Sequence, residues 1–98
     1  MYRYGSYDEM LAKELKNLEF AKGFLQSLME DDDGLSLIEA LKHTIRRMGI
    51  KEFSQISGIP EKSISRMVNS ESVPKLETFD RYCAPFGLKI NLALEDAA

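Results

Sequence analysis

The sequence predicts an all-α fold, a bundle of five to six helices that ends in one short β-strand. Apolar residues recur three and four positions apart as far as residue 86, which is the spacing of one face of an α-helix. Over 88–94 the spacing changes to strict alternation, which is typical of a half-buried strand. One strand cannot pair its own backbone, so we expect a second copy of the chain, and hence a homodimer.

Three longer helices are expected in the first half of the chain. Ser6 followed by Glu9 is a capping-box pattern, which predicts that the first helix begins directly after Ser6. Asn17 is a suitable N-cap for a second helix. This helix should end within 30–34, because acidic side chains at a helix C-terminus oppose the helix dipole. A third helix is expected over 35–48 and should end at the glycine that follows.

Shorter elements are expected in the second half. One helix is predicted over 51–57 and another over 60–69, with a glycine turn between them. A last helix should begin at Lys75 and be kinked or shortened near Pro85, because proline lacks the N–H that a helix needs. The positions of this helix that we expect to be buried are Leu76, Phe79, Cys83 and Phe86.

The composition is that of a single globular domain. The chain has 98 residues, of which 44% are hydrophobic and 30% are charged. No apolar run approaches the ~20 residues of a membrane span, and the N-terminus lacks a signal-peptide pattern. We therefore expect a cytoplasmic protein with no membrane association.

No catalytic or metal-binding pattern is visible. Cys83 is the single cysteine and His43 the single histidine, so no disulfide and no Cys/His metal site is expected within one chain. A Ser-His-Asp set and a glycine-rich phosphate loop are also lacking. We expect neither an enzyme nor a bound metal or cofactor.

The spacing within 51–69 is that of a helix-turn-helix. This motif needs an apolar anchor and a small residue in its first helix, a glycine and an apolar residue at the turn, and inward apolar residues in its second helix. The alternative is a plain helical hairpin inside a bundle. The residues at the motif positions are Phe53, Ser54, Gly58, Ile59, Ile64 and Met67.

The outward side chains of the second helix suit DNA. In this motif the second helix enters the major groove, with its N-terminal residues nearest the base edges. Arg66 or Lys62 can bond guanine, Glu61 can accept from cytosine, and short hydroxyls suit phosphates. For each residue the alternative is an ordinary solvated side chain. The candidate DNA-binding residues are Lys51, Glu61, Lys62, Ser63, Ser65, Arg66, Asn69 and Ser70.

Charged residues are distributed unevenly along the chain. The net charge of -3 argues against DNA binding when taken as an average. However, 1–34 holds four basic and eight acidic residues, whereas 35–75 holds seven basic and four acidic residues. We therefore predict three parts: an N-terminal helical extension (1–34), a helix-turn-helix DNA-binding domain (35–88), and a C-terminal strand and tail (89–98).

The stretch GIPEKSISRMVNSESVPKLETFDRYCAPFGLKI, from Gly58 to Ile90, resembles the second half of the xenobiotic-response-element (Cro/C1-type repressor) helix-turn-helix family. The sequence departs from that family at Lys51-Glu52, where Thr-Gln is usual, and the Glu52 carboxylate would repel a phosphate. The matching positions are Gly58, Ile59, Pro60, Ser63, Ile64, Ser65, Arg66, Met67, Pro74, Leu76, Glu77, Thr78, Phe79 and Phe86-Gly87-Leu88.

The N-terminal stretch YGSYDEMLAKELKNLEFAKGFLQSLMEDDD resembles the start of the probable addiction module antidote proteins, a HigA-like antitoxin group. This resemblance implies the antitoxin of a type II toxin–antitoxin module. Such a protein neutralises a RelE/HigB-like toxin and, as a homodimer, represses its own operon. The implied partners are the cognate toxin and double-stranded operator DNA.

Two alternatives stay open at the level of the sequence. One is a stand-alone helix-turn-helix repressor without a toxin, and the other is a helical interaction module that does not bind DNA. The acidic segment 1–34 would suit a basic partner, because complementary charge favours encounter, or it only forms a solvated face.

Overall fold

The structure, a computed structural model, describes residues 4–30, 34–71 and 73–90. Within these ranges it contains six α-helices, one short 3₁₀ helix and no β-strand. The prediction of an all-α bundle is therefore confirmed. The elements are α1 (Tyr4–Leu15), α2 (Leu18–Met29), α3 (Leu37–Met48), α4 (Ile50–Ser57), α5 (Glu61–Asn69), α6 (Leu76–Cys83) and the 3₁₀ helix η1 (Ala84–Phe86).

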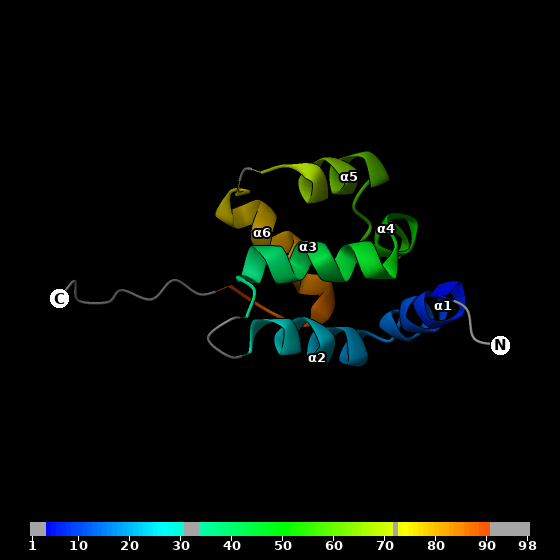
Figure 1. The fold of residues 1–98 in the computed structure, drawn as a ribbon. Helices are drawn as coiled ribbons and strands as arrows, with labels where there is room; N and C mark the ends of the chain where they lie inside the picture. The colour runs from blue at the N-terminus through cyan, green and yellow to red at the C-terminus, as the bar shows by residue number, and fades with distance from the viewer. Residues whose placement is uncertain (1–3, 31–33, 72, 91–98) are drawn as a thin grey trace.

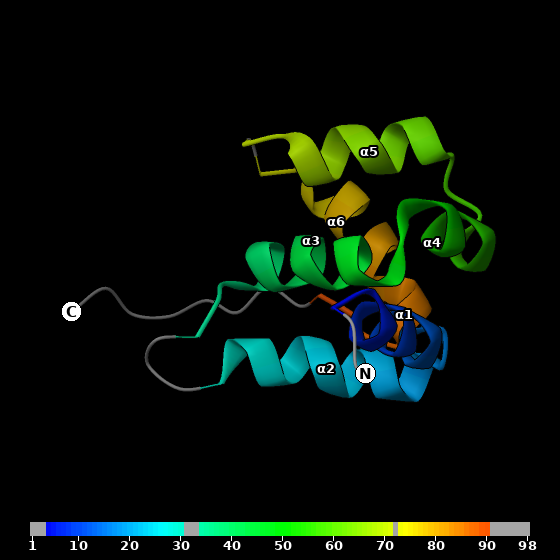
Figure 2. The ribbon, with the colours of Figure 1, turned by 45° about the vertical axis from the view of Figure 1, so that its right-hand side comes forward.

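Helix α3 lies at the centre of the bundle. Both views place α1 and α2 on one side of α3 and α5 on the other side (Figure 1 and Figure 2). Helices α1 and α2 pack against α3 and against each other, and α4 and α5 do the same. The N-terminal helices and α5 therefore form opposite surfaces of the molecule.

One hydrophobic core joins the helices. The ring of Phe53 lies near its middle, with centroids 6.1 Å from Tyr82 and 5.6 Å from Phe86, which are ordinary distances for stacked aromatic pairs. The predicted boundary at residue 34 lies in the connection between α2 and α3, and the three-part division stays a prediction. The buried hydrophobic residues are Leu15, Ala21, Leu25, Ala40, Leu41, Ile45, Met48, Phe53, Ile59, Ile64, Met67, Val68, Tyr82, Cys83 and Phe86.

Among the first three helices, the start of α2 follows the sequence, whereas the starts of α1 and α3 differ from it. Asn17 caps α2, because its Oδ1 accepts hydrogen bonds from the N–H groups of Glu19 (3.0 Å) and Phe20 (3.3 Å). The prediction of a cap at Ser6 is wrong: α1 begins at Tyr4, so Ser6 lies inside the helix, whereas a capping residue lies before it.

The capping box of this chain is at the start of α3. Ser36 Oγ accepts from the N–H of Glu39 at 3.3 Å, and Glu39 Oε1 accepts from the N–H of Ser36 at 3.3 Å. The Ser36 hydroxyl donates to Glu39 Oε1 at 2.8 Å, and this bond, followed by the one from the Ser36 N–H, lowers the pKa of the Glu39 carboxyl. Helix α3 therefore begins at Leu37, two residues later than predicted.

The last helix is shortened at Pro85, as predicted. The α-helix ends at Cys83, and the chain continues as the 3₁₀ helix η1. The prediction that Leu76 is buried is wrong, because Leu76 begins α6 and is 45% exposed. Tyr82, which the spacing did not single out, is 3% exposed and fills the core instead.

The predicted strand over 88–94 is not formed in its described part. Residues 88–90 have no strand assignment. The N–H of Leu88 donates to Cys83 O at 3.3 Å, and the N–H of Ile90 donates to Asp80 Oδ1 at 3.1 Å. Because α6 satisfies these donors, they do not need a neighbouring strand. Residues 91–94 of the prediction lie outside the described part of the chain.

Candidate nucleic-acid interface

A closed turn joins α4 to α5. Gly58 has a φ of 77°, the left-handed conformation that glycine adopts without strain, and its N–H donates to Ser54 O at 2.9 Å. Ser54 Oγ donates to Ile59 O at 2.6 Å, and Ser57 Oγ accepts from the N–H of Ile59 at 3.1 Å. The small residue and the glycine of the expected motif therefore both take part in this turn.

The apolar positions of the expected motif hold α5 in place. Phe53, Ile59, Ile64 and Met67 are all buried, with Met67 the most exposed at 8%. Helix α5 packs through them against α3 and α4. Val68 is buried as well, and the other side chains of α5 are polar and at least partly exposed.

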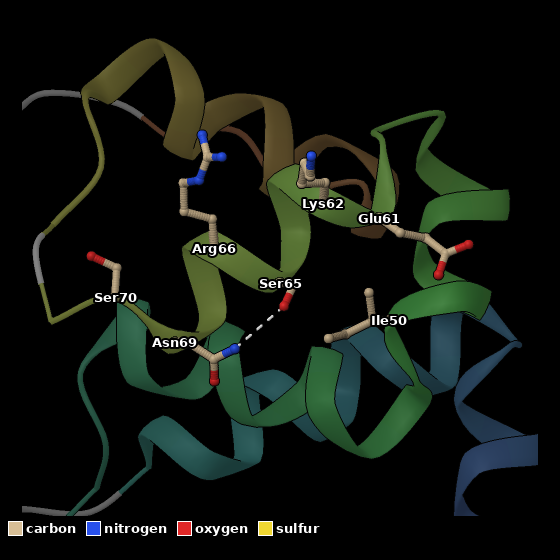
Figure 3. A pocket seen from close by; sticks show the side chains of 7 residues that line it. All are labelled: Ile50, Glu61, Lys62, Ser65, Arg66, Asn69 and Ser70. Carbon is tan, nitrogen blue, oxygen red and sulfur yellow. Dashed lines mark hydrogen bonds between the residues drawn. The ribbon is translucent and has the colours of Figure 1, made fainter.

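An open hollow of about 860 Å³ lies beside the outward face of α5. Figure 3 shows the side chains that line it. Six of the eight candidate DNA-binding residues line it, and Ile50 at the start of α4 closes one side. Asn69 Nδ2 donates a hydrogen bond to Ser65 Oγ at 3.4 Å, which is long for such a bond. The lining residues are Ile50, Glu61, Lys62, Ser65, Arg66, Asn69 and Ser70.

A second hollow, of about 460 Å³, lies between α5 and α6. Arg66 and Ser70 line it as well as the first hollow, so they stand on the ridge between the two. Ser63, another candidate DNA-binding residue, lines this second hollow. Lys75 and Thr78, which sequence reasoning did not select, also line it. A basic residue directly before the acidic first turn of α6 is the only signal that could have pointed to Lys75.

Lys51 is the one candidate that lines neither hollow. It is exposed in the first turn of α4, next to Ile50. Glu52, expected to repel a phosphate, is half-buried, and its carboxylate folds back against Gly49 at the start of the same helix. Negative charge is favourable at a helix N-terminus, which accounts for this position.

Cys83 and His43 lie outside the two hollows and have shifted pKa values. Burial, followed by the Asp80 carboxylate, raises the pKa of the Cys83 thiol to about 11, so this thiol stays protonated at neutral pH. Burial, followed by Arg47 and Arg46, lowers the pKa of His43. Among the described residues, no group of three or more His, Cys, Asp or Glu side chains is placed to hold a metal ion.

In the part of the chain that the structure covers, no helix combines the length and the apolar character needed to cross a membrane.

The outward side of α5 is a polar, partly basic surface on a short helix that is anchored by its buried residues.

Comparison with protein-family models gives a match over residues 6–94, to the family described as Probable addiction module antidote protein. Comparison with curated proteins and with solved structures gives no match. The family match extends from α1 through α6 and past η1, so it includes both the N-terminal helices and the α4–α5 unit. The chain therefore belongs to the probable addiction module antidote protein family.

Proposed function

We propose that this protein is an antitoxin that neutralises a toxin of the RelE/HigB kind and represses its own operon by binding operator DNA. Membership of the antidote family supports the antitoxin role, implies a toxin as partner, and points to a regulatory protein that is not an enzyme. The outward face of α5 carries the DNA-binding part of the proposal. It gathers six of the eight candidate DNA-binding residues around one hollow.

In this proposal α4 and α5 are a helix-turn-helix, and α5 is the recognition helix. The major groove of B-DNA, about 12 Å wide, admits one α-helix. Arg66 and Lys62 are suited to guanine, and Glu61 is suited to a cytosine amine. Ser63, Ser65, Asn69 and Ser70 then contribute neutral hydrogen bonds, and Lys51 approaches a phosphate from α4.

The proposed repressor acts as a homodimer. Helix α5 has nine residues, enough to read only one half-site. Two copies related by a two-fold axis place their recognition helices in successive major grooves, about 34 Å apart. The expected operator is therefore an inverted repeat.

The proposed toxin-binding surface lies on α1 and α2. Six large hydrophobic side chains are exposed in the described part of the chain, and four of them belong to these two helices. Such side chains within a polar surface are typical of protein–protein interfaces. The exposed carboxylates of Glu9, Glu14 and Glu19 belong to the same two helices and would attract a basic partner. The four exposed hydrophobic residues are Met10, Leu18, Phe20 and Met29.

The opposite positions of α2 and α5 about α3 support a protein that binds both partners together (Figure 1). A toxin on α1 and α2 leaves the outward face of α5 uncovered. The repressor is then expected to bind DNA both alone and as a complex with the toxin.

The toxin part is tested by co-expression with the product of the neighbouring gene. We expect the two proteins to purify together, and we expect a Met10→Asp/Phe20→Asp variant to lose the partner. Val73→Asp is the matched control, because Val73 is 69% exposed but lies beyond α5, on the other surface. A chain that binds DNA but captures no neighbouring protein would be a stand-alone repressor.

The DNA part is tested by titrating DNA from upstream of its own gene at several salt concentrations. A protein that contacts phosphates loses affinity steeply as salt rises, because counterions are released on binding. Absence of binding, or binding without salt dependence, would contradict the repressor role and favour a helical interaction module.

A further inference from the structure

Two cations on α3 bind the C-terminal end of α5. Lys42 Nζ donates a hydrogen bond to the backbone oxygen of Ser70, and an Arg46 guanidinium N–H donates to the backbone oxygen of Val68. Lys42 and Arg46 are four residues apart on α3, so they lie one turn apart on the same face of that helix. We call this pair the α3 clasp.

The acceptors of the α3 clasp are groups that a helix cannot satisfy by itself. The last carbonyl oxygens of a helix have no partner within it, and they carry the negative end of the helix dipole. Donors with a full positive charge form the stronger kind of hydrogen bond. The two bonds also span 28 and 22 residues of the chain, so they tie α5 to α3 directly.

The α3 clasp fixes the end of α5 that the turn does not reach. The hydrogen bond between Ser54 and Ile59 holds the beginning of α5. Along the helix, α5 is held by the apolar contacts of Ile64, Met67 and Val68. Apolar contacts have little directionality, whereas hydrogen bonds weaken steeply with angle. The clasp therefore sets the direction in which α5, and with it Arg66, points.

We propose that Lys42 and Arg46 are positioning residues for DNA binding, which hold α5 at its reading angle without contacting DNA. The inference rests on the proposed function, because it takes α5 as the recognition helix. It differs from what the charge count of 35–75 suggests, since two of the seven basic side chains there are directed to backbone oxygens of the same chain. Arg46 is exposed, so a phosphate contact is the competing role.

The test compares the full-length protein with a Lys42→Met/Arg46→Met variant. Methionine keeps most of the apolar stem and removes the charged donors. We expect faster amide hydrogen exchange in the last turn of α5 in the absence of DNA, because the helix end frays. We also expect operator binding about tenfold weaker, with an unchanged slope of log affinity against log salt. A lost phosphate contact would lower this slope by about one per residue.

Two further variants control this test. Lys13→Met/Lys16→Met removes the same charge from exposed positions near the end of α1 and should leave α5 exchange and operator affinity unchanged. Lys42→Arg/Arg46→Lys keeps a charged donor at both positions and should restore exchange protection and most of the affinity.

Three outcomes would overturn the proposal. A salt slope lowered by about two with unchanged exchange would assign both side chains to phosphates. Faster exchange with unchanged affinity would show that the clasp stabilises α5 without positioning it for DNA. Equal loss of affinity in the Lys13→Met/Lys16→Met variant would show that the weaker binding results from the change in net charge alone.

Failure of the inference is distinguishable from failure of the proposed function. Suppose that the wild-type protein binds operator DNA and that Arg66→Ala weakens this binding. If the Lys42→Met/Arg46→Met variant then binds as well as the wild type, only the positioning role is wrong. If the wild-type protein binds no operator DNA, the proposed function is wrong and the positioning role falls with it. The exchange measurement still reports whether the clasp holds the end of α5.

Discussion

Arg66 stands on the ridge between the two hollows that flank α5, exposed and on the outward face of the helix. A guanidinium at this position meets two conditions for contacting a base. Its planar donor fork is accessible, and the helix that carries it is held in place by its buried face. The same side chain takes no part in the core, so its removal separates binding from folding.

We predict that Arg66→Ala weakens operator binding by about 1–3 kcal/mol and leaves the free energy of unfolding nearly unchanged. Titration with operator DNA and urea denaturation measure the two quantities. Arg81→Ala is the matched control, because Arg81 is exposed on α6 and lines neither hollow. Unchanged affinity of Arg66→Ala would mean that α5 is not the reading helix.

Cys83 gives a prediction about reactivity. Because burial raises the pKa of its thiol to about 11, the thiolate is scarce at pH 8. Iodoacetamide should therefore react at least about a hundredfold more slowly with the folded protein than with the protein in denaturant. Mass spectrometry of timed samples measures both rates, and similar rates would show that Cys83 is accessible.

At the scale of elements, the junction between α3 and α4 depends on one glycine. Gly49 ends α3 and begins α4 with a φ of 110° and a ψ of 133°, a conformation that residues with a Cβ rarely adopt. The Glu52 carboxylate also occupies the space that a Cβ on Gly49 would need. The backbone conformation therefore disfavours any residue with a Cβ here, and the Glu52 carboxylate would also have to move aside.

We predict that Gly49→Ala lowers the free energy of unfolding by about 1–3 kcal/mol. Urea denaturation measures the change. Gly23→Ala is the control: Gly23 lies inside α2 with no atom within 4 Å of an added Cβ, so this change should stabilise the protein by about 0.5–1 kcal/mol. Equal effects of the two substitutions would contradict the assigned junction.

The sequence predicted the elements well where a single local interaction defines them. The amide oxygen of Asn17 reaches N–H groups two and three residues ahead, and Gly58 needs no distant partner to turn the chain. The capping-box pattern of Ser6 and Glu9 led to a wrong prediction of the helix start, because a Ser-x-x-Glu spacing marks a cap only if the helix starts there. The spacing recurs at Ser36 and Glu39, where the helix does start.

At the scale of the whole molecule, the packing of α2 on α3 links stability to pH. The rings of Phe24 and His43 stack between these helices with centroids 6.4 Å apart. Burial, with repulsion from Arg47 and Arg46, lowers the pKa of His43 below its usual 6.5. The unfolded chain therefore binds a proton at a higher pH than the folded chain does.

We predict that the folded state loses stability as pH falls below about 6.5, until the lowered pKa of His43 is passed. Above pH 6.5 the contribution of the neutral imidazole is fully present. Denaturant titrations of wild-type protein and of a His43→Gln variant between pH 7.5 and 5 should show a shallower pH dependence in the variant. Parallel curves would show that His43 titrates normally.

Two different surfaces belong to one small molecule. Exposed apolar side chains and the carboxylates of Glu9, Glu14 and Glu19 belong to α1 and α2, while the polar side chains of α5 lie beyond α3. The net charge of -3 is a sum over the whole chain and does not reveal this separation. Their separation supports a protein with two partners.

Sequence patterns alone predict the helical fold class, the glycine turn after α4, the buried anchors Phe53, Ile59 and Ile64, and the outward side chains of α5. These follow from periodicity and from contacts a few residues long, which one short segment contains in full. Three features emerge from the packing of the helices: Tyr82 and not Leu76 fills the core, α6 satisfies the N–H groups of Leu88 and Ile90, and Lys42 and Arg46 bind the end of α5. Each of these depends on where distant segments meet, because a polar group is satisfied by whichever partner the packing brings within reach.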